Sequence, residues 1–240
     1  MQNAETSSEK VSNPVMSITA VIPVKGSSSR LPGKNILPFG SDNLLTHKIR
    51  QLKQVSKISE VLVSSDSDAM LHMAQNENVR AIKRPIDLAN ESRPFGDLVR
   101  HITGFLSTEH LMWTPVTSPT LDSNFYTEAI NMYFDAVECG FDSLTTTIPF
   151  RHFLLDADGP LNFKPFDSTN AITNSDELPE VDLWTCGCSI ISTKLAYDIR
   201  YIFGVNPYRY RVSPYHALDI DTQFDYDIAK FMWEKDNGKQ

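Results

Sequence analysis

The sequence predicts a single α/β domain in which helices cover both faces of a mostly parallel sheet. Short β-branched or apolar runs alternate with segments whose apolar residues recur at helical spacing. This alternation is typical of parallel strands joined by crossover helices. A chain of 240 residues, 41% of them hydrophobic, is also long enough to bury a full core. Such sheets bind ligands at the carboxyl ends of their strands, so motifs at those ends are the candidates for function.

The predicted elements begin with a strand, a loop, a helix and a second strand. Residues 18–24 are β-branched and apolar and end in a Gly- and Ser-rich turn, as expected of a buried first strand. Residues 43–55 place Leu45, Ile49 and Leu52 at helical spacing. The later strands are expected at 60–64, 79–83, 111–116, 143–148, 184–192 and 208–212. The later helices are expected at 67–75, 96–106, 123–138, 194–203 and from near Asp221.

Two segments fall outside this alternation. Residues 1–17 are polar and lack the apolar centre of a secretory signal, so we expect a disordered tail before a folded domain at 18–240. Residues 149–182 are rich in Phe, Pro, Asp and Asn, show no period and are too long for an ordinary connection. We expect them to form either an active-site cover or an arm that contacts a second subunit.

Composition excludes several classes of protein. The formal net charge of -8 argues against a general nucleic-acid binder, and no stretch approaches the ~20 apolar residues that span a bilayer. Three cysteines give neither a disulfide framework nor a zinc site, and the six histidines lack zinc-ligand spacing. We therefore expect a soluble, cytoplasmic protein with free thiols, without a nucleic-acid or membrane partner.

The loop after the first strand carries three cations, Lys25, Arg30 and Lys34, among glycines and serines. Backbone N–H groups near Gly26 and Ser hydroxyls can bond phosphate oxygens, and the cations can balance the charge of a triphosphate. The loop is not a P-loop, because Asn35 follows the Gly-Lys pair. A solvated surface loop is the alternative interpretation.

Near the end of the chain, Asp219 and Asp221 are separated by one residue. Two carboxylates at this spacing can face one hard cation, and magnesium is commonly held by one or two carboxylates together with substrate phosphates. For Asp221 the alternative is helix capping, because apolar residues at helical spacing begin at Phe224. Asp219 lies outside that helix.

Taken together, these motifs resemble the family of CMP-N-acylneuraminate (sialic acid) cytidylyltransferases and CMP-Kdo synthetases. The loop reads I-P-V-K-x-x-S-x-R-L-P-G-K-N, with Lys25 where the family usually has arginine. The other matching motifs are V-S-S-D at 63–66, R-P-x-x-L-A at 84–89, T-S-P at 117–119 and D-I-D-T-x-x-D at 219–225. Before the T-S-P turn, W-T-P-V replaces the family's L-Q-P, whose glutamine is associated with the sugar. We therefore expect an altered acceptor pocket.

The resemblance implies a single-domain Rossmann-like nucleotide-diphospho-sugar transferase fold with a protruding arm that builds a homodimer. It implies that CTP and an acidic 2-keto sugar, a sialic-acid-like nonulosonate, react to give the CMP-sugar and pyrophosphate. Catalysis would be mostly positioning and charge neutralisation. The implied catalytic residues are Lys34, Asp219 and Asp221, with Mg²⁺ bound by the two aspartates. The implied nucleotide-binding residues are Lys25, Ser28, Arg30, Lys34, Asn35 and Arg84.

Two alternatives stay open from the sequence. A non-catalytic sugar-nucleotide-binding relative would keep the site without turnover, as Lys25 and the missing glutamine weakly suggest. A metal-dependent glycosyltransferase would use the Asp-Ile-Asp motif for its metal, although Lys34 and Asn35 would then be unexplained. The acidic sugar and the general base are left open.

Overall fold

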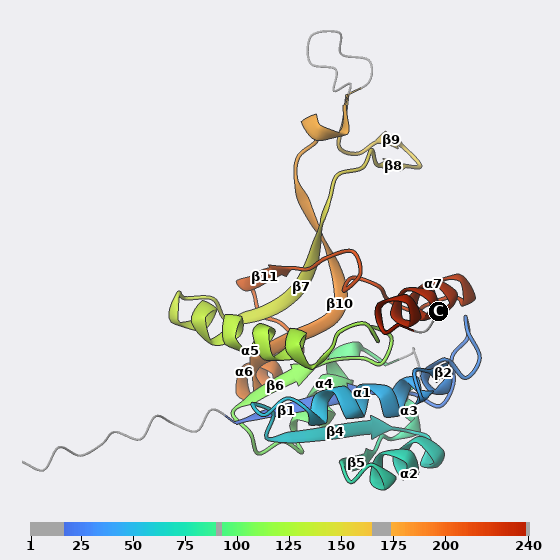
Figure 1. Ribbon diagram of the computed structural model, residues 1–240. Helices are drawn as coiled ribbons and strands as arrows, with labels where there is room; N and C mark the ends of the chain where they lie inside the picture. The colour runs from blue at the N-terminus through green and yellow to red at the C-terminus, as the bar shows by residue number, and fades with distance from the viewer. Residues whose placement is uncertain (1–16, 90–92, 165–173, 239–240) are drawn as a thin grey trace, which may run out of the picture.

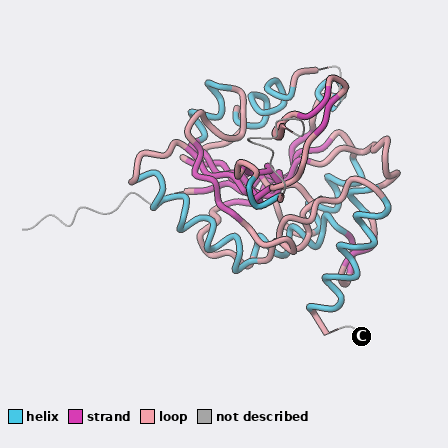
Figure 2. Tube along the Cα trace, turned by 90° about the horizontal axis from the view of Figure 1, so that it is seen from above, coloured by secondary structure: helices cyan, strands magenta, loops and turns pink. Residues whose placement is uncertain are grey.

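A computed structural model describes residues 17–89, 93–164 and 174–238. The expected disordered tail lies outside the described residues except for Ser17. The described chain folds around one seven-stranded sheet with helices packed on both of its faces (Figure 2).

The sheet has the strand order β11-β7-β10-β6-β1-β4-β5. Its strands are β1 (Ile18–Pro23), β4 (Glu60–Ser65), β5 (Arg80–Lys83), β6 (His110–Trp113), β7 (Ser143–Phe150), β10 (Val181–Ser192) and β11 (Pro207–Arg211). Four pairings are parallel, whereas β10 runs antiparallel to both β6 and β7. The prediction of a mostly parallel α/β sheet is therefore confirmed.

Helices follow most strands, as the apolar spacing predicts. They are α1 (Leu44–Lys53), α2 (Asp68–Asn76), α3 (Ile86–Ala89), α4 (Phe95–Thr103), α5 (Ser123–Glu138), α6 (Thr193–Ile199) and α7 (Gln223–Asp236). Short 3-10 turns η1 (Lys34–Ile36) and η2 (Ser175–Glu177) and the hairpins β2 (Pro38–Phe39)–β3 (Asp42–Asn43) and β8 (Leu155–Asp156)–β9 (Gly159–Pro160) complete the fold. Side chains of Asn43, Ser67 and Asp122 cap α1, α2 and α5 by accepting from backbone N–H groups.

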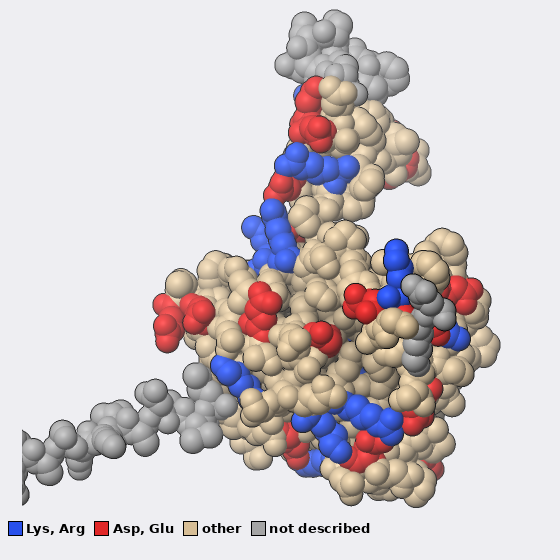
Figure 3. Space-filling model, viewed as in Figure 1, with Lys and Arg blue, Asp and Glu red and all other residues tan. Residues whose placement is uncertain are grey.

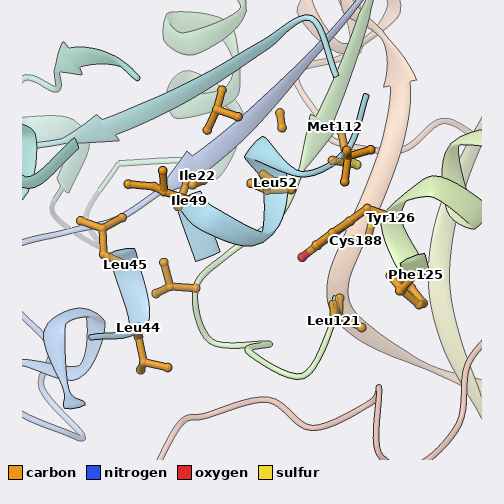
Figure 4. Packing of buried hydrophobic residues seen from close by; sticks show 14 of the residues in the cluster. Ile22, Leu44, Leu45, Ile49, Leu52, Met112, Leu121, Phe125, Tyr126 and Cys188 are labelled. Carbon is orange, nitrogen blue, oxygen red and sulfur yellow. The ribbon is translucent and has the colours of Figure 1, made fainter. Parts of the chain in front are cut away.

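Two apolar clusters pack on opposite faces of the sheet. In β1, Ile18, Ala20 and Ile22 face the cluster that α1 and α5 complete, while Val21 faces the cluster of α4 and α6. This alternation follows from the two-residue period of a strand. Figure 4 shows the larger cluster, where Tyr126 reaches from α5 toward α1. Both faces of β1 are covered, so its carboxyl end is held firmly at the edge where the predicted motifs lie.

Strands β7 and β10 continue beyond the sheet as a two-stranded arm, which carries the hairpin β8–β9 (Figure 1). Ion pairs line it, with Glu180 bonded to Arg151 and Arg211, and Asp182 bonded to Arg209 and Arg211. Charged side chains accordingly gather along the arm and its base (Figure 3). The strands predicted at 143–148 and 184–192 extend further into residues 149–182 than expected, because cross-strand pairing extends β7 to Phe150 and begins β10 at Val181.

Several predicted boundaries differ from the structure. The helix predicted at 194–203 ends at Ile199, because Arg200 adopts a left-handed conformation with φ 57°. The strand predicted at 111–116 ends at Trp113, where the chain leaves the β10 ladder. Within the described ranges, every helix is too short or too polar to cross a bilayer.

Candidate active site

The structure brings the loop after β1 into contact with the Asp-Ile-Asp segment before α7. Lys34 Nζ donates to Asp221 Oδ1 at 3.0 Å and to the carbonyl oxygen of Ile220 at 2.9 Å. Arg30 Nη1 donates to Asp221 Oδ2 at 2.7 Å. The Lys34 side chain is 13% exposed, whereas those of Arg30 and Asp221 are 64% and 38% exposed. One carboxylate thus faces two cations at an accessible edge.

Contacts with neighbouring segments fix the shape of this loop. The backbone N–H of Gly26 donates to Asp66 Oδ1 at 2.9 Å, just beyond β4. A Cβ at Gly26 would lie only 3.1 Å from the Cβ of Ser67, so glycine permits the close approach. The Asn35 amide donates to the carbonyl oxygen of Lys25 at 2.8 Å. Hydrogen bonds of the loop backbone therefore link the carboxyl ends of β1 and β4.

The individual loop residues differ in their surroundings. Asn35 is 7% exposed, so its side chain is used to close the loop on itself, while Ser28 is half-buried. Gly33 has φ 67°, a left-handed conformation that suits glycine and starts the η1 turn carrying Lys34. Lys34 is therefore presented by a short turn of fixed geometry.

Asp219 lies beside this cluster and is more deeply placed than Asp221. Its Oδ1 is buried with no partner in the described part of the chain, and the Thr117 side chain favours its charged form. Burial raises the pKa of Asp219, and the negative charge of Asp221 raises it further. A buried carboxylate oxygen without a partner is unusual, and a bound ion is one group that could satisfy it.

A magnesium ion fits this donor set only in part. Asp219 Oδ1 is available, whereas both oxygens of Asp221 are engaged by Lys34 and Arg30. No group of three or more His, Cys, Asp or Glu side chains suited to a metal occurs among the described residues. Magnesium in proteins is commonly held by only one or two carboxylates, with water and substrate phosphates as its other ligands.

The interpretation of Asp221 as a helix cap is wrong. The N-cap of α7 is Thr222, whose side chain accepts from the backbone N–H of Asp225. The Asp225 carboxylate in turn accepts from the backbone N–H of Thr222 at 2.7 Å, which completes a capping box. The backbone N–H of Asp221 also donates to the Asp225 carboxylate at 3.1 Å. The Asp221 side chain takes no part in this cap and bonds Lys34 and Arg30 instead.

Arg84 lies under the site with its side chain buried. It is 4% exposed, and its Nη2 donates to the Ser64 carbonyl oxygen at 2.8 Å, while Nε has no partner among the described residues. Burial lowers its pKa to about 10, and the charge of Asp66 opposes that shift. The guanidinium therefore ties β5 to the end of β4, and its Nε is buried without a partner among the described residues.

Thr114 and Pro115, which lie where a glutamine is expected, differ in burial. Thr114 is fully buried, and its hydroxyl shares a 2.7 Å bond with Tyr126 and donates to the Gly187 carbonyl oxygen at 3.2 Å. Pro115 is half-buried and has no side-chain donor. The hydrogen-bonding side chain expected of a glutamine is therefore absent at this place.

Sequence reasoning missed Asp66 and Cys186. Asp66 ends the V-S-S-D motif, so its signal was present. Cys186 has φ 59° at a register shift in β10, and burial, followed by the charges of Asp219 and Asp221, raises its pKa to about 11. This thiol therefore lies near the two aspartates in its neutral form. All three cysteines are free, as predicted.

A cytidylyltransferase family model matches residues 19–175, which include the loop, Asp66, Arg84 and the T-S-P turn. The chain belongs to the cytidylyltransferase family. The resemblance inferred from the motifs is therefore confirmed.

Members of the family among characterised proteins are distant in sequence. The N-acylneuraminate cytidylyltransferase of Escherichia coli O18:K1:H7 (strain RS218) is 25% identical over 228 residues, which cover 93% of this chain and 54% of that protein. The pseudaminic acid cytidylyltransferase of Campylobacter jejuni subsp. jejuni serotype O:23/36 is 22% identical over 224 residues, which cover 89% of this chain and 95% of that protein. The chain thus spans about half the length of the first relative and nearly all of the second.

Solved structures of cytidylyltransferases share the fold. A CMP:2-keto-3-deoxy-manno-octonic acid synthetase complexed with CTP has a TM-score of 0.66 at 14% identity, with 91% of this chain and 99% of that chain covered. The 4-diphosphocytidyl-2C-methyl-D-erythritol synthase from Anaerococcus prevotii has a TM-score of 0.63 at 15% identity, covering 93% of this chain and all (100%) of that one. The predicted Rossmann-like nucleotidyltransferase fold is confirmed.

Proposed function

We propose that this protein is a magnesium-dependent cytidylyltransferase that joins CMP from CTP to an acidic 2-keto sugar of the sialic-acid kind. The observation that carries the proposal is the convergence of Lys34, Arg30 and Asp221 at the carboxyl end of β1. This edge of a parallel sheet is where nucleotides bind in related architectures. Family membership and the chemistry of the side chains point to the same reaction.

In the proposed reaction, the anomeric oxygen of the sugar attacks the α-phosphorus of CTP. A new P–O bond forms, the bond to the bridging oxygen of the β-phosphate breaks, and pyrophosphate leaves with the electron pair; the sugar hydroxyl gives up its proton. Negative charge grows on the triphosphate during this step, so Lys34, Arg30 and Lys25 would stabilise it. Because phosphoryl-type transfer needs little covalent help from protein, positioning by Ser28 and the loop backbone supplies much of the remainder.

Asp219 and Asp221 would hold the magnesium ion. When bound, the ion supplies charge neutralisation at the phosphate oxygens. The orphaned Oδ1 of Asp219 supports this role. Asp221 shares its charge with Lys34 and Arg30 in the free protein, and a bound triphosphate gives those two cations another anionic partner. The two cations and the ion would then together offset most of the negative charge of the triphosphate.

The acceptor is proposed as a nonulosonate because two relatives are named for N-acylneuraminate and pseudaminic acid, which are both of this class. Pro115 offers no hydrogen bond where related enzymes are expected to have a glutamine. A pocket without that side chain favours an acceptor other than N-acetylneuraminic acid.

Pyrophosphate release from CTP with magnesium tests the function, using neuraminic, legionaminic, pseudaminic, deaminated nonulosonic and Kdo acids as acceptors. We expect release with CTP and one acid, and none with ATP, GTP or UTP. CTP binding without release for any acid would favour a non-catalytic relative. Transfer of a sugar from a nucleotide-sugar donor would favour a glycosyltransferase, against which the cytidylyltransferase match argues.

We also propose that the arm docks a second copy of the chain to form a homodimer. Val181 and Leu183 point to the same side of β10 and are 46% and 51% exposed, and Phe153, Leu155 and Leu161 add further exposed apolar area nearby in the arm. Exposed apolar residues grouped in this manner are typical of interfaces. Sedimentation of wild type and Leu183→Asp tests the interface, with a monomeric variant expected.

The free thiols support action in a reducing compartment, the cytoplasm.

A further inference from the structure

Lys48 on α1 is a fully buried lysine that the proposed reaction does not use. It is 0% exposed, and its Nζ donates to the carbonyl oxygen of Ser118 at 2.7 Å and to the hydroxyl of Tyr126 at 2.5 Å. Nζ also lies 5.0 Å from the centre of the Tyr126 ring. Within the described ranges, no carboxylate forms a salt bridge with it, so its acceptors are uncharged oxygen atoms.

Burial of an amine at this place is unfavourable in its charged form. Desolvation lowers the pKa of Lys48 to about 7, although Cys188 and Asp122 nearby favour its charge. An apolar side chain of similar length would fill the same space without this penalty. What an apolar side chain would lack is a donor for the Ser118 carbonyl oxygen, so that bond is the feature that distinguishes a lysine here.

Ser118 belongs to the T-S-P turn, residues 117–119, which α1 holds at several points. Gln51 Nε2 donates to the Pro119 carbonyl oxygen at 3.0 Å, and His47 Nε2 shares a 3.2 Å bond with the same oxygen. Together with Lys48, these side chains are spaced along one face of α1. The carbonyl oxygens of Ser118 and Pro119 therefore accept hydrogen bonds from side chains of α1.

The other side of the turn contacts the segment that carries the two aspartates. The Thr117 carbonyl oxygen accepts from the backbone N–H of Ile220 at 2.8 Å, and the Thr117 side chain favours the charged form of Asp219. Ile220 is 0% exposed and lies between Asp219 and Asp221. A continuous chain of bonds thus runs from Lys48 through the turn to the Asp-Ile-Asp segment.

We propose that Lys48 is a positioning residue whose bond to Ser118 holds the 117–119 turn, and through it holds Asp219 and Asp221 in place for cytidylyl transfer. This role rests on the proposed function and deepens it, because Lys48 acts through the turn and touches neither substrate nor metal. A shift of about 1 Å in a catalytic group can cost about 100-fold in rate. Loosening of the turn should therefore reduce turnover more than it reduces nucleotide binding.

The test compares Lys48→Met with Tyr126→Phe in the full chain. The first variant keeps the length of the side chain and removes the donor to Ser118. The second removes the other partner of Lys48, the Tyr126 hydroxyl, and leaves the Ser118 bond in place. Both substitutions lie in the same buried region. Unfolding by denaturant measures the stability that each variant loses, so that the two losses can be compared.

Amide hydrogen exchange at Ile220 is the readout that needs no activity. We expect Lys48→Met to speed exchange at Ile220 by about tenfold relative to the amide of Val21 in the central strand, whereas Tyr126→Phe leaves that ratio unchanged. In the pyrophosphate assay, Lys48→Met should lower kcat by about 10- to 100-fold and raise the magnesium concentration for half activity, with KM for CTP changed by less than about threefold.

Unchanged Ile220 exchange in Lys48→Met, or equal effects of the two variants on exchange and on kcat, would overturn the positioning role. If Lys48→Met does not fold, Lys48→Leu, which also lacks a donor to Ser118, carries the same comparison with the same decisive outcomes. Failure of the wild-type chain to release pyrophosphate would instead contradict the proposed function, and Ile220 exchange still decides whether Lys48 holds the turn.

Discussion

Lys34 and Asp221 are 187 positions apart in the sequence, yet Lys34 Nζ lies 3.0 Å from Asp221 Oδ1. Lys34 is the first residue of the η1 turn, near the start of the domain, and Asp221 lies just before α7. In the free protein each neutralises the other. In the proposed reaction the lysine faces phosphate and the aspartate faces magnesium, so the pair holds the two groups close to where they act.

Removal of the Asp221 carboxylate should abolish magnesium-dependent turnover and leave the fold intact. Asp221→Asn is conservative in shape, the side chain is 38% exposed, and Thr222 rather than Asp221 caps α7. Pyrophosphate release should fall by at least about 100-fold while circular dichroism is unchanged. Asp227→Asn is the matched control, since it removes one charge from the exposed face of the same helix. Wild-type rates in Asp221→Asn would refute the metal assignment.

Lys34→Met should reduce turnover far more than stability. The side chain bonds the Ile220 carbonyl oxygen and Asp221. A partly exposed ion pair of this kind contributes about 1 kcal/mol or less to folding, whereas a cation at a reacting triphosphate is worth about 100-fold or more in rate. Parallel measurements of kcat and of the free energy of unfolding separate the two effects. A rate loss that matches the fraction of unfolded protein would count against a catalytic Lys34.

Asp219→Asn should stabilise the protein while inactivating it. The pKa of Asp219 is raised in the folded state, so the folded chain binds this proton more readily than the unfolded chain. Stability from the group is therefore present at low pH and is lost as the pH rises through the raised pKa. The amide stays neutral at every pH, so the variant should have the higher Tm at pH 8, and the difference should disappear as the pH falls below the ordinary Asp range. A lower Tm at pH 8 would contradict the buried, ionised state of Asp219.

Lys48→Met should also change how stability depends on pH. The folded pKa of Lys48 is about 7 and its ordinary value is 10.5, so between these values the unfolded chain holds a proton that the folded chain has released. Wild-type stability should therefore gain with rising pH across this window, and the variant should lack that gain.

Three neighbours of Lys48 have folded-state pKa values outside this window, and their titration in the unfolded chain is common to wild type and Lys48→Met. Burial lowers the pKa of His47 to about 4 and raises that of Cys188 to about 12, and it raises the pKa of Tyr126 well above its usual range. Asp122, which caps α5, is the remaining charged neighbour. Urea unfolding at pH 7 and pH 9.5 measures the difference between wild type and Lys48→Met. Identical pH slopes for the two proteins would show that Lys48 titrates normally.

Local patterns predicted most of the fold because each element carries its own signal. The apolar spacing in α1, the β-branched run of β1 and the cap at Asn43 are all short-range features. The arm was harder to predict, since its strand ends depend on pairing between β7 and β10 across an intervening segment. Helix α3, with four residues and no buried side chain, has too little apolar pattern to reveal itself.

The motifs indicated which residues of the candidate site lie together, but they did not indicate the surroundings of those residues. Motif chemistry identified Lys34, Arg30 and Asp221, which the structure brings together. It did not reveal that Asn35 closes the loop on the Lys25 carbonyl group, because hydrogen-bond partners depend on the path of the backbone. The burial of Lys48 did leave a signal, since it lies three residues after Leu45 and four before Leu52 on the apolar face of α1.

The pairing of the loop after β1 with the segment before α7 has a consequence for synthesis on the ribosome. The loop after β1, which is proposed to bind phosphate, is made early, and nearly two hundred further residues must be translated before Asp219 and Asp221 can reach it. A nascent chain can complete much of its central sheet before it has the two carboxylates. Catalytic competence therefore arrives late in translation, after the scaffold that orients it, and a chain released before residue 219 would lack it altogether.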